Sequence, residues 1–164
     1  MKKLVLIRHA KSDWHSDAAT DFDRPLNKRG KKNAPIMAQR LATRGCSPDL
    51  ILSSPARRAH ETVEIIAKRL DCPTTEITFD QSIYEANLET LIKLVRGLDD
   101  ELENVILVGH NPGFSELGEW FSDDAPEWLP TCGLLELELA ISAWADATEG
   151  CGIVSGYDYP KKKS

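Results

Sequence analysis

Residues 4–9 read LVLIRH, and this stretch decides the fold prediction because four apolar residues lead straight into an arginine and a histidine. A short apolar run with β-branched residues predicts a buried strand. The strand would end by presenting Arg8 and His9 side by side. Polar side chains often mark only the point where a strand reaches the surface, so this stretch alone does not separate a surface position from a catalytic one.

The remainder of the chain alternates strand-like and helix-like segments. Apolar runs predict further strands at 49–53, 75–79, 104–109, 134–139 and 152–156. Helical spacing predicts helices at 28–44, from Ser54 to about Leu70, at 88–97 and after Gly113, with Ser54 as the cap of the second helix. The alternation predicts an α/β fold, a three-layer α/β/α sandwich with a largely parallel central sheet. The strand at 134–139 alternates apolar and acidic residues, which is typical of an edge or half-exposed strand.

Bulk composition limits the classes of function. The 164 residues favour a single domain over 1–164, with 41% hydrophobic and 28% charged residues as in ordinary globular proteins. A net charge of −6 argues against nucleic acid or an anionic membrane as a partner. No segment has the length of an export signal or a membrane span, and the four scattered cysteines fit reduced thiols. We therefore expect a cytoplasmic protein.

Chemically active side chains follow several of the predicted strands. In open α/β sheets, ligands bind beyond the carboxyl ends of the strands. These ends carry, in chain order, Arg8 with His9, then Arg57 with Arg58, then Tyr84 with Glu85, and finally His110. We therefore expect two arginine sites, two histidines and one carboxylate to meet at one edge of the sheet.

Such a cluster could bind an anion and place it in contact with a nucleophile. Arginine forks bind phosphoryl oxygens in pairs, and a neutral imidazole can attack phosphorus and form a phosphohistidine. A zinc site is the alternative for two histidines, but Arg8 beside His9 would repel a dication and no H-E-x-x-H motif is present. A phosphate-binding P-loop motif is absent as well. The two other histidines, His15 and His60, are expected to be ordinary polar residues.

Four ordered blocks resemble the signature of the histidine phosphatase superfamily, which includes phosphoglycerate mutases and acid phosphatases. The blocks are LIRHA (6–10), DRPLNKRG (23–30), SSPARRAHET (53–62) and VGHN (108–111). The third block resembles the S-x-x-x-R-A-x-x-T pattern of the family and places its arginine at Arg58. Ala10 departs from the usual glycine of the first block. Within the superfamily, the short chain and the stretches 8–12 and 111–113 resemble the SixA-type phosphohistidine phosphatases.

The resemblance implies a phosphoglycerate mutase-like fold and a role for each matching residue. His9 would be the nucleophile, and Arg8, Arg58 and His110 would hold the phosphoryl group, with no metal and no cofactor. Glu85 is the candidate proton donor for the leaving group. The short stretches between the blocks imply an open site, as a phosphohistidine carried by a protein requires.

The function expected from these observations is a metal-independent phosphatase that removes phosphate from phosphohistidine on a protein. A small-molecule phosphomonoesterase of the same superfamily is the nearest alternative. A non-catalytic phosphate-binding module is another, from a different class of protein. A mutase is disfavoured, because the short chain offers little to enclose a phosphorylated intermediate.

Overall fold

The strand that contains residues 4–8 lies inside a six-stranded sheet. The computed structural model describes residues 1–162, and the strand order is β3-β2-β4-β1-β5-β6. The strands are β1 (Lys2–Arg8), β2 (Leu50–Ser53), β3 (Thr78–Phe79), β4 (Asn104–Gly109), β5 (Leu134–Leu139) and β6 (Gly152–Asp158). The strands β3, β2, β4 and β1 run parallel to one another, whereas β5 is antiparallel to both β1 and β6. The predicted α/β class with a largely parallel sheet is confirmed.

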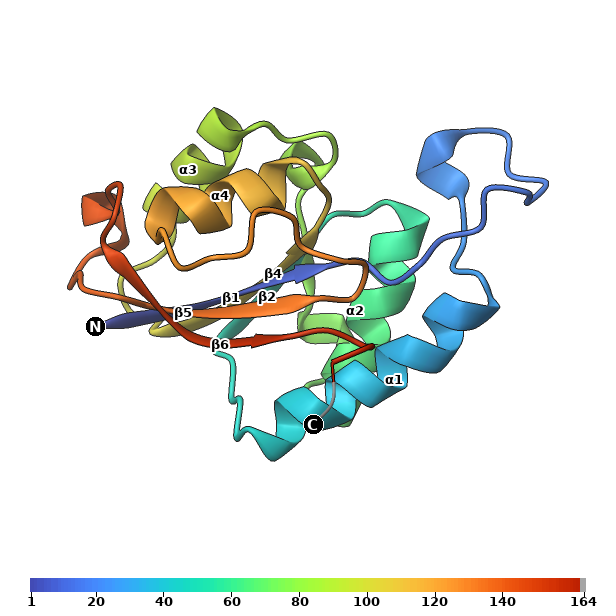
Figure 1. The fold of residues 1–164 in the computed structure, drawn as a ribbon, viewed down its shortest axis with the longest axis horizontal. Coiled ribbons are helices and arrows are strands. Elements are labelled where there is room, and N and C mark those ends of the chain that lie inside the picture. The colour runs from blue at the N-terminus through green and yellow to red at the C-terminus, as the bar shows by residue number, and fades with distance from the viewer. Residues whose placement is uncertain (163–164) are drawn as a thin grey trace.

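Helices cover both faces of this sheet. They are α1 (Lys28–Thr43), α2 (Arg57–Arg69), α3 (Leu88–Arg96) and α4 (Gly113–Phe121). Figure 1 shows α1 and α2 on one side of the sheet and α3 and α4 on the other, which confirms the three layers. Within the described residues 1–162, no helix is long and apolar enough to cross a membrane.

The strand β1 is buried on both faces, and its side chains alternate between two hydrophobic clusters. Leu4 and Leu6 pack in the cluster beneath α3 and α4, whereas Val5 and Ile7 pack in the cluster beneath α1 and α2. Because a strand repeats every two residues, a slip of one residue would move both pairs to the wrong cluster. The burial of β1 therefore fixes where Arg8 and His9 emerge.

One prediction about an individual element is wrong, and the structure decides between the two alternatives of another. The helix α2 begins at Arg57 and not at Ser54, because Ser54 still extends β2 through a backbone hydrogen bond to Val108. Its hydroxyl does not cap the helix, and the N-cap Ala56 has no side chain that could. Of the two alternatives for 134–139, the edge strand is excluded because β6 pairs with the outer side of β5, and the half-exposed strand is confirmed because Glu136 and Glu138 are partly exposed between buried leucines.

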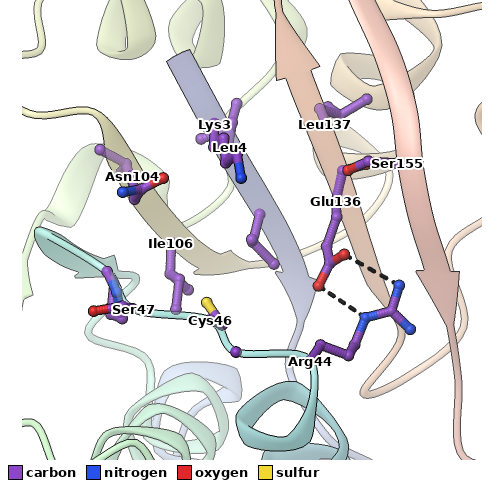
Figure 2. A pocket seen from close by; sticks show the side chains of 14 residues that line it. Lys3, Leu4, Arg44, Cys46, Ser47, Asn104, Ile106, Glu136, Leu137 and Ser155 are labelled. Carbon is purple, nitrogen blue, oxygen red and sulfur yellow. Dashed lines mark hydrogen bonds and ion pairs between the residues drawn. The ribbon is translucent and has the colours of Figure 1, made fainter. Parts of the chain in front are cut away.

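One of the two acidic residues of β5 forms an ion pair with the end of α1. Glu136 accepts two hydrogen bonds from Arg44, at 2.9 and 3.1 Å, and so joins the end of α1 to the sheet. This ion pair borders a hollow of about 210 Å³ at the amino ends of β1 and β4 (Figure 2). Lys3, Cys46 and Asn104 also line the hollow. It contains none of the predicted site residues, which lie at the opposite ends of the strands.

Candidate active site

The ends of β1 and β4 lie side by side and bring two histidines together. Arg8 is paired with Gly109 in the parallel ladder, and the next residue, His9, donates its backbone N–H to the Gly109 carbonyl at 3.0 Å. The rings of His9 and His110 have centroids 5.2 Å apart. A Cβ atom at Gly109 would lie 2.5 Å from the ring of Phe114, so only glycine fits between the strand and α4. The register of the sheet therefore creates the histidine pair.

Two arginines lie beside the histidine pair, and the positive charges of both act on His9. Arg58, from the first turn of α2, is only 7% exposed and donates to the backbone oxygen (2.8 Å) and the carboxylate (3.1 Å) of Asp21. Arg8 donates to the carbonyl of Leu129 at 3.1 Å. Burial, together with the charge of Arg58, lowers the pKa of Arg8. Two partly buried cations beside the same histidines favour the binding of an anion at this place.

His9 presents an unprotonated nitrogen. Its ring is 7% exposed, and Nδ1 lies 2.7 Å from the Ala10 carbonyl oxygen. Because a carbonyl can only accept, Nδ1 carries the proton and Nε2 keeps its lone pair. Burial lowers the pKa of His9 to about 3, and the charges of His110, Arg58 and Arg8 act in the same direction against the hydrogen bond to Ala10. The imidazole is therefore neutral at pH 7.

His110 makes a different contact. Its Nε2 lies 2.7 Å from the hydroxyl of Ser54, and its Nδ1 is buried with no hydrogen-bond partner. Burial, followed by the charge of Arg58, lowers its pKa to about 4. Both histidines are thus neutral at pH 7, and each has one ring nitrogen without a protein partner: Nε2 of His9 and Nδ1 of His110.

Asp21 and Thr62 hold these residues in place through hydrogen bonds, and neither was among the predicted site residues. Asp21 binds Arg58, accepts from Arg24 at 3.0 Å and accepts from the Tyr84 hydroxyl at 2.7 Å. Although burial opposes it, these hydrogen bonds lower the pKa of Asp21 to about 2. Thr62 accepts from the Ala10 N–H at 3.0 Å and donates to the Arg58 carbonyl at 2.7 Å.

Only one of these two residues belongs to a sequence pattern that could have identified it. Thr62 is the threonine of the S-x-x-x-R-A-x-x-T pattern, and it ties the end of β1 to α2. Asp21 lies in the loop between β1 and α1, in the blue segment that projects beyond the sheet in Figure 1, and it is 37 residues from Arg58. No local pattern connects it to that arginine.

Four of the five predicted site residues meet, and the fifth lies outside their contacts. Arg8, His9, Arg58 and His110 form one cluster. Glu85 is exposed, has a positive φ of 60° and follows Tyr84, whose ring packs edge-on against His110. The hydrogen bonds of the two histidines go to Ala10 and Ser54 and not to Glu85. The structure therefore places Glu85 near the cluster but does not join it to the histidines.

The donor set suits an anion. Among residues 1–162, no group of three or more His, Cys, Asp or Glu side chains could hold a metal ion. The cluster instead combines two guanidinium groups, two neutral imidazoles and the first turn of α2. Guanidinium N–H groups match the oxygens of phosphoryl groups in geometry as well as in charge.

Comparison with known proteins connects this geometry to a family. The sequence profile of the histidine phosphatase superfamily (branch 1) matches residues 4–110. An uncharacterized chloroplastic protein of Arabidopsis thaliana is 31% identical and covers 89% of this chain and 70% of its own length. An uncharacterized protein of Mycobacterium tuberculosis is 29% identical over 94% of this chain and 100% of its own.

Solved structures agree over nearly the whole chain. The crystal structure of a candidate phosphohistidine phosphatase SixA from Agrobacterium tumefaciens has a TM-score of 0.82 and 30% identity, covering 97% of this chain and 98% of that one. A protein histidine phosphatase SixA in complex with tungstate has a TM-score of 0.81 and 21% identity, covering 96% and 97%. At 21% identity, the second likeness concerns the fold alone.

Proposed function

The chain belongs to branch 1 of the histidine phosphatase superfamily, and we propose that it is a phosphatase that acts through a phosphohistidine formed on His9. We further propose that its substrate is phosphohistidine carried by another protein. The proposal includes three further expectations: the chain forms a single domain, it acts in the cytoplasm, and the reaction needs no metal. Arg8, Arg58 and His110 are the residues that would hold the phosphoryl group.

Unpaired hydrogen-bonding atoms are the observation that carries the proposal. Within residues 1–162, three buried side-chain nitrogen or oxygen atoms have no hydrogen-bond partner: Arg8 Nε, Arg58 Nε and His110 Nδ1. Each buried, unpaired polar group costs about 1–3 kcal/mol. All three belong to the residues proposed to bind phosphate, so a ligand rich in acceptor oxygens would satisfy them together.

The reaction proceeds in two displacements at phosphorus. The Nε2 lone pair of His9 forms a bond to phosphorus while the bond to the leaving group breaks, and the leaving group takes up a proton from solvent water. Water then attacks the phosphohistidine and the bond from Nε2 to phosphorus breaks. Inorganic phosphate leaves, and the neutral imidazole of His9 is restored. Arg8, Arg58 and the His110 Nδ1–H would stabilise the charge on the phosphoryl oxygens in both steps.

The surroundings of the site support a leaving group that departs easily. The carboxylate bound into the cluster is Asp21, and its pKa of about 2 keeps it ionised and unable to donate a proton at pH 7. Glu85, the candidate donor, is exposed and makes no hydrogen bond to either histidine. An imidazole leaves a phosphoramidate more readily than an alkoxide leaves a phosphoester, so it depends less on a general acid.

Exposed aromatic side chains beside the cluster support a substrate carried by a protein. Trp128 is 55% exposed and lies over the guanidinium of Arg8, with 5.6 Å from Cζ to the ring centroid. Trp14 is 73% exposed and stacks on Arg24, which in turn binds Asp21. Exposed tryptophans are enriched at protein contact surfaces. They would meet the protein around a phosphohistidine more effectively than they would meet a small phosphoester.

Phosphate release from a histidine-phosphorylated carrier protein tests the proposal. We expect a higher kcat/KM on this carrier than on a panel of sugar and nucleotide phosphates, and the same rate with and without a chelator. Preference for one of the small phosphoesters would favour the alternative phosphomonoesterase. Tight binding of the carrier without phosphate release would favour the non-catalytic module and contradict an enzymatic role.

A further inference from the structure

Ser54 lies behind His110 and is fully buried. It follows β2, and its backbone N–H donates to the Val108 carbonyl at 2.9 Å, which continues the ladder to β4. Its hydroxyl oxygen accepts from the backbone N–H of Ala56 at 3.2 Å and lies 2.7 Å from His110 Nε2. Ser54 therefore touches the histidine on the side opposite its unpaired nitrogen.

The direction of the hydrogen bond between Ser54 and His110 follows from the number of protons available. If His110 Nε2 donated, the Ser54 oxygen would accept two N–H groups, and its own buried proton would have no acceptor. If Ser54 donates instead, its hydroxyl makes one bond in each direction and is satisfied. His110 Nδ1 has no partner in either arrangement, so the first leaves two buried polar groups unsatisfied and the second leaves only one. Since buried polar groups are nearly always paired, the second arrangement is the favoured one.

We propose that Ser54 is a positioning residue that holds His110 in the tautomer with the proton on Nδ1. In water, the neutral imidazole of histidine prefers the opposite tautomer, with the proton on Nε2. The Ser54 hydroxyl reverses this preference and turns the unpaired Nδ1 into a donor for a phosphoryl oxygen. The consequence for catalysis rests on the proposed function, whereas the tautomer itself does not.

A neighbouring residue provides a matched control. Ser53 is also fully buried, and its hydroxyl donates to the Ser54 carbonyl at 2.9 Å without contacting His110. Replacing either serine with alanine removes one buried hydroxyl from the same strand end. Only Ser54→Ala removes the donor to His110.

Nitrogen-15 NMR of the histidine side chains in the full chain tests the tautomer without any substrate. In the wild-type protein at pH 7, we expect a protonated, pyrrole-like Nδ1 and an unprotonated, pyridine-like Nε2 at His110. Ser54→Ala should move the His110 pattern toward protonated Nε2, whereas Ser53→Ala and Ser54→Thr should keep the wild-type pattern. A pyridine-like Nδ1 in the wild-type protein would overturn the proposal, even if no variant folds.

Kinetics then measure what the tautomer contributes. Ser54→Ala should lower kcat/KM on the phosphorylated carrier by about 10- to 100-fold, the range seen when the partners that orient metal-binding histidines are removed. The loss should fall mainly on kcat, because the Nδ1–H bond strengthens as charge develops. Wild-type kcat with a changed tautomer would overturn the catalytic consequence. A wild-type protein that releases no phosphate but shows the expected tautomer would contradict the proposed function alone.

Discussion

The ends of β1 and β4 present the same residue type in the same neutral state, but with opposite ring nitrogens left open. His9 and His110 are 7% and 9% exposed, and burial lowers the pKa of both. His9 donates through Nδ1 to a carbonyl, which leaves Nε2 as a base. His110 meets a hydroxyl at Nε2, which leaves Nδ1 free to donate. The partner of the opposite ring nitrogen therefore decides which histidine can be a nucleophile.

The two partners differ in how firmly the chain fixes them. His9 is bound by the carbonyl of Ala10, the next residue, so local backbone geometry sets its tautomer. His110 is bound by a hydroxyl 56 residues away, and this contact depends on the pairing of β2 with β4. A change at Ser54 can therefore alter the second histidine, whereas no side-chain substitution removes the carbonyl that holds the first.

Substitution of His9 should have the largest effect. His9→Ala removes the nucleophile, and we expect phosphate release from the carrier protein to fall to the background of the assay. His9→Asn should be equally inactive, because an amide offers hydrogen bonds but no comparable lone pair. Full activity in His9→Ala, with an unchanged circular dichroism spectrum, would contradict the assignment of the two histidines.

Substitution of His110 should have a smaller effect that depends on the donor. His110→Ala should lower kcat/KM by about 10²- to 10³-fold, the cost of one donor to developing charge. His110→Asn should recover part of this loss, because its amide can still donate. Steady-state kinetics on the same carrier measure both variants. If His110→Ala abolished activity as His9→Ala does, and His110→Asn recovered none of it, the two histidines would not have distinct roles.

Both histidines should make stability depend on pH. Their folded pKa values, about 3 and about 4, lie below the ordinary value of 6.5, so the unfolded chain binds protons first as the pH falls. The contribution of the two neutral histidines to the free energy of unfolding should therefore be fully present well above pH 6.5 and decrease as the pH falls. The loss is on the order of 2 kcal/mol per histidine between pH 6.5 and pH 5.

Urea denaturation at several pH values measures this dependence. We expect His9→Ala and His110→Ala each to flatten the slope between pH 6.5 and pH 5, because each variant removes one proton that the unfolded chain would bind. A wild-type protein as stable at pH 5 as at pH 7.5 would contradict two buried, neutral histidines.

Glu85 should have the smallest effect. We expect Glu85→Gln to keep kcat/KM on the phosphohistidine carrier close to that of the wild type, because the imidazole leaving group needs little assistance. A general acid typically contributes about 10²- to 10⁴-fold. A loss of that size on the carrier, measured beside an aryl phosphate as a substrate with a good leaving group, would identify Glu85 as the proton donor.

Much of the site could be predicted because it lies where strands end. Apolar runs determine the ends of β1 and β4, and the topology of a parallel sheet brings Arg8, His9 and His110 together. Arg58 lies in the first turn of the following helix, so its position followed from the same alternation. The family resemblance then indicated the role of each residue.

What the sequence could not predict depends on contacts between distant segments. Asp21 meets Arg58 from a loop, and Ser54 resembles a helix cap until the pairing with β4 places it against His110. The alternation of β5 left an edge strand and a half-exposed strand open, and only the pairing with β6 and the contact of Glu136 with Arg44 show that it is not an edge. In each case the partner is many residues away, where periodicity and capping patterns carry no information.

The most direct test is to trap the phosphorylated enzyme and identify the phosphorylated atom. Rapid quenching during turnover of the phosphorylated carrier, followed by phosphorus NMR and peptide mapping, assigns the phosphoryl group to one nitrogen. We predict an acid-labile, alkali-stable phosphohistidine on His9, with phosphorus bonded to Nε2. Phosphorus on Nδ1 of His9, on His110 or on no residue of the protein would contradict the account.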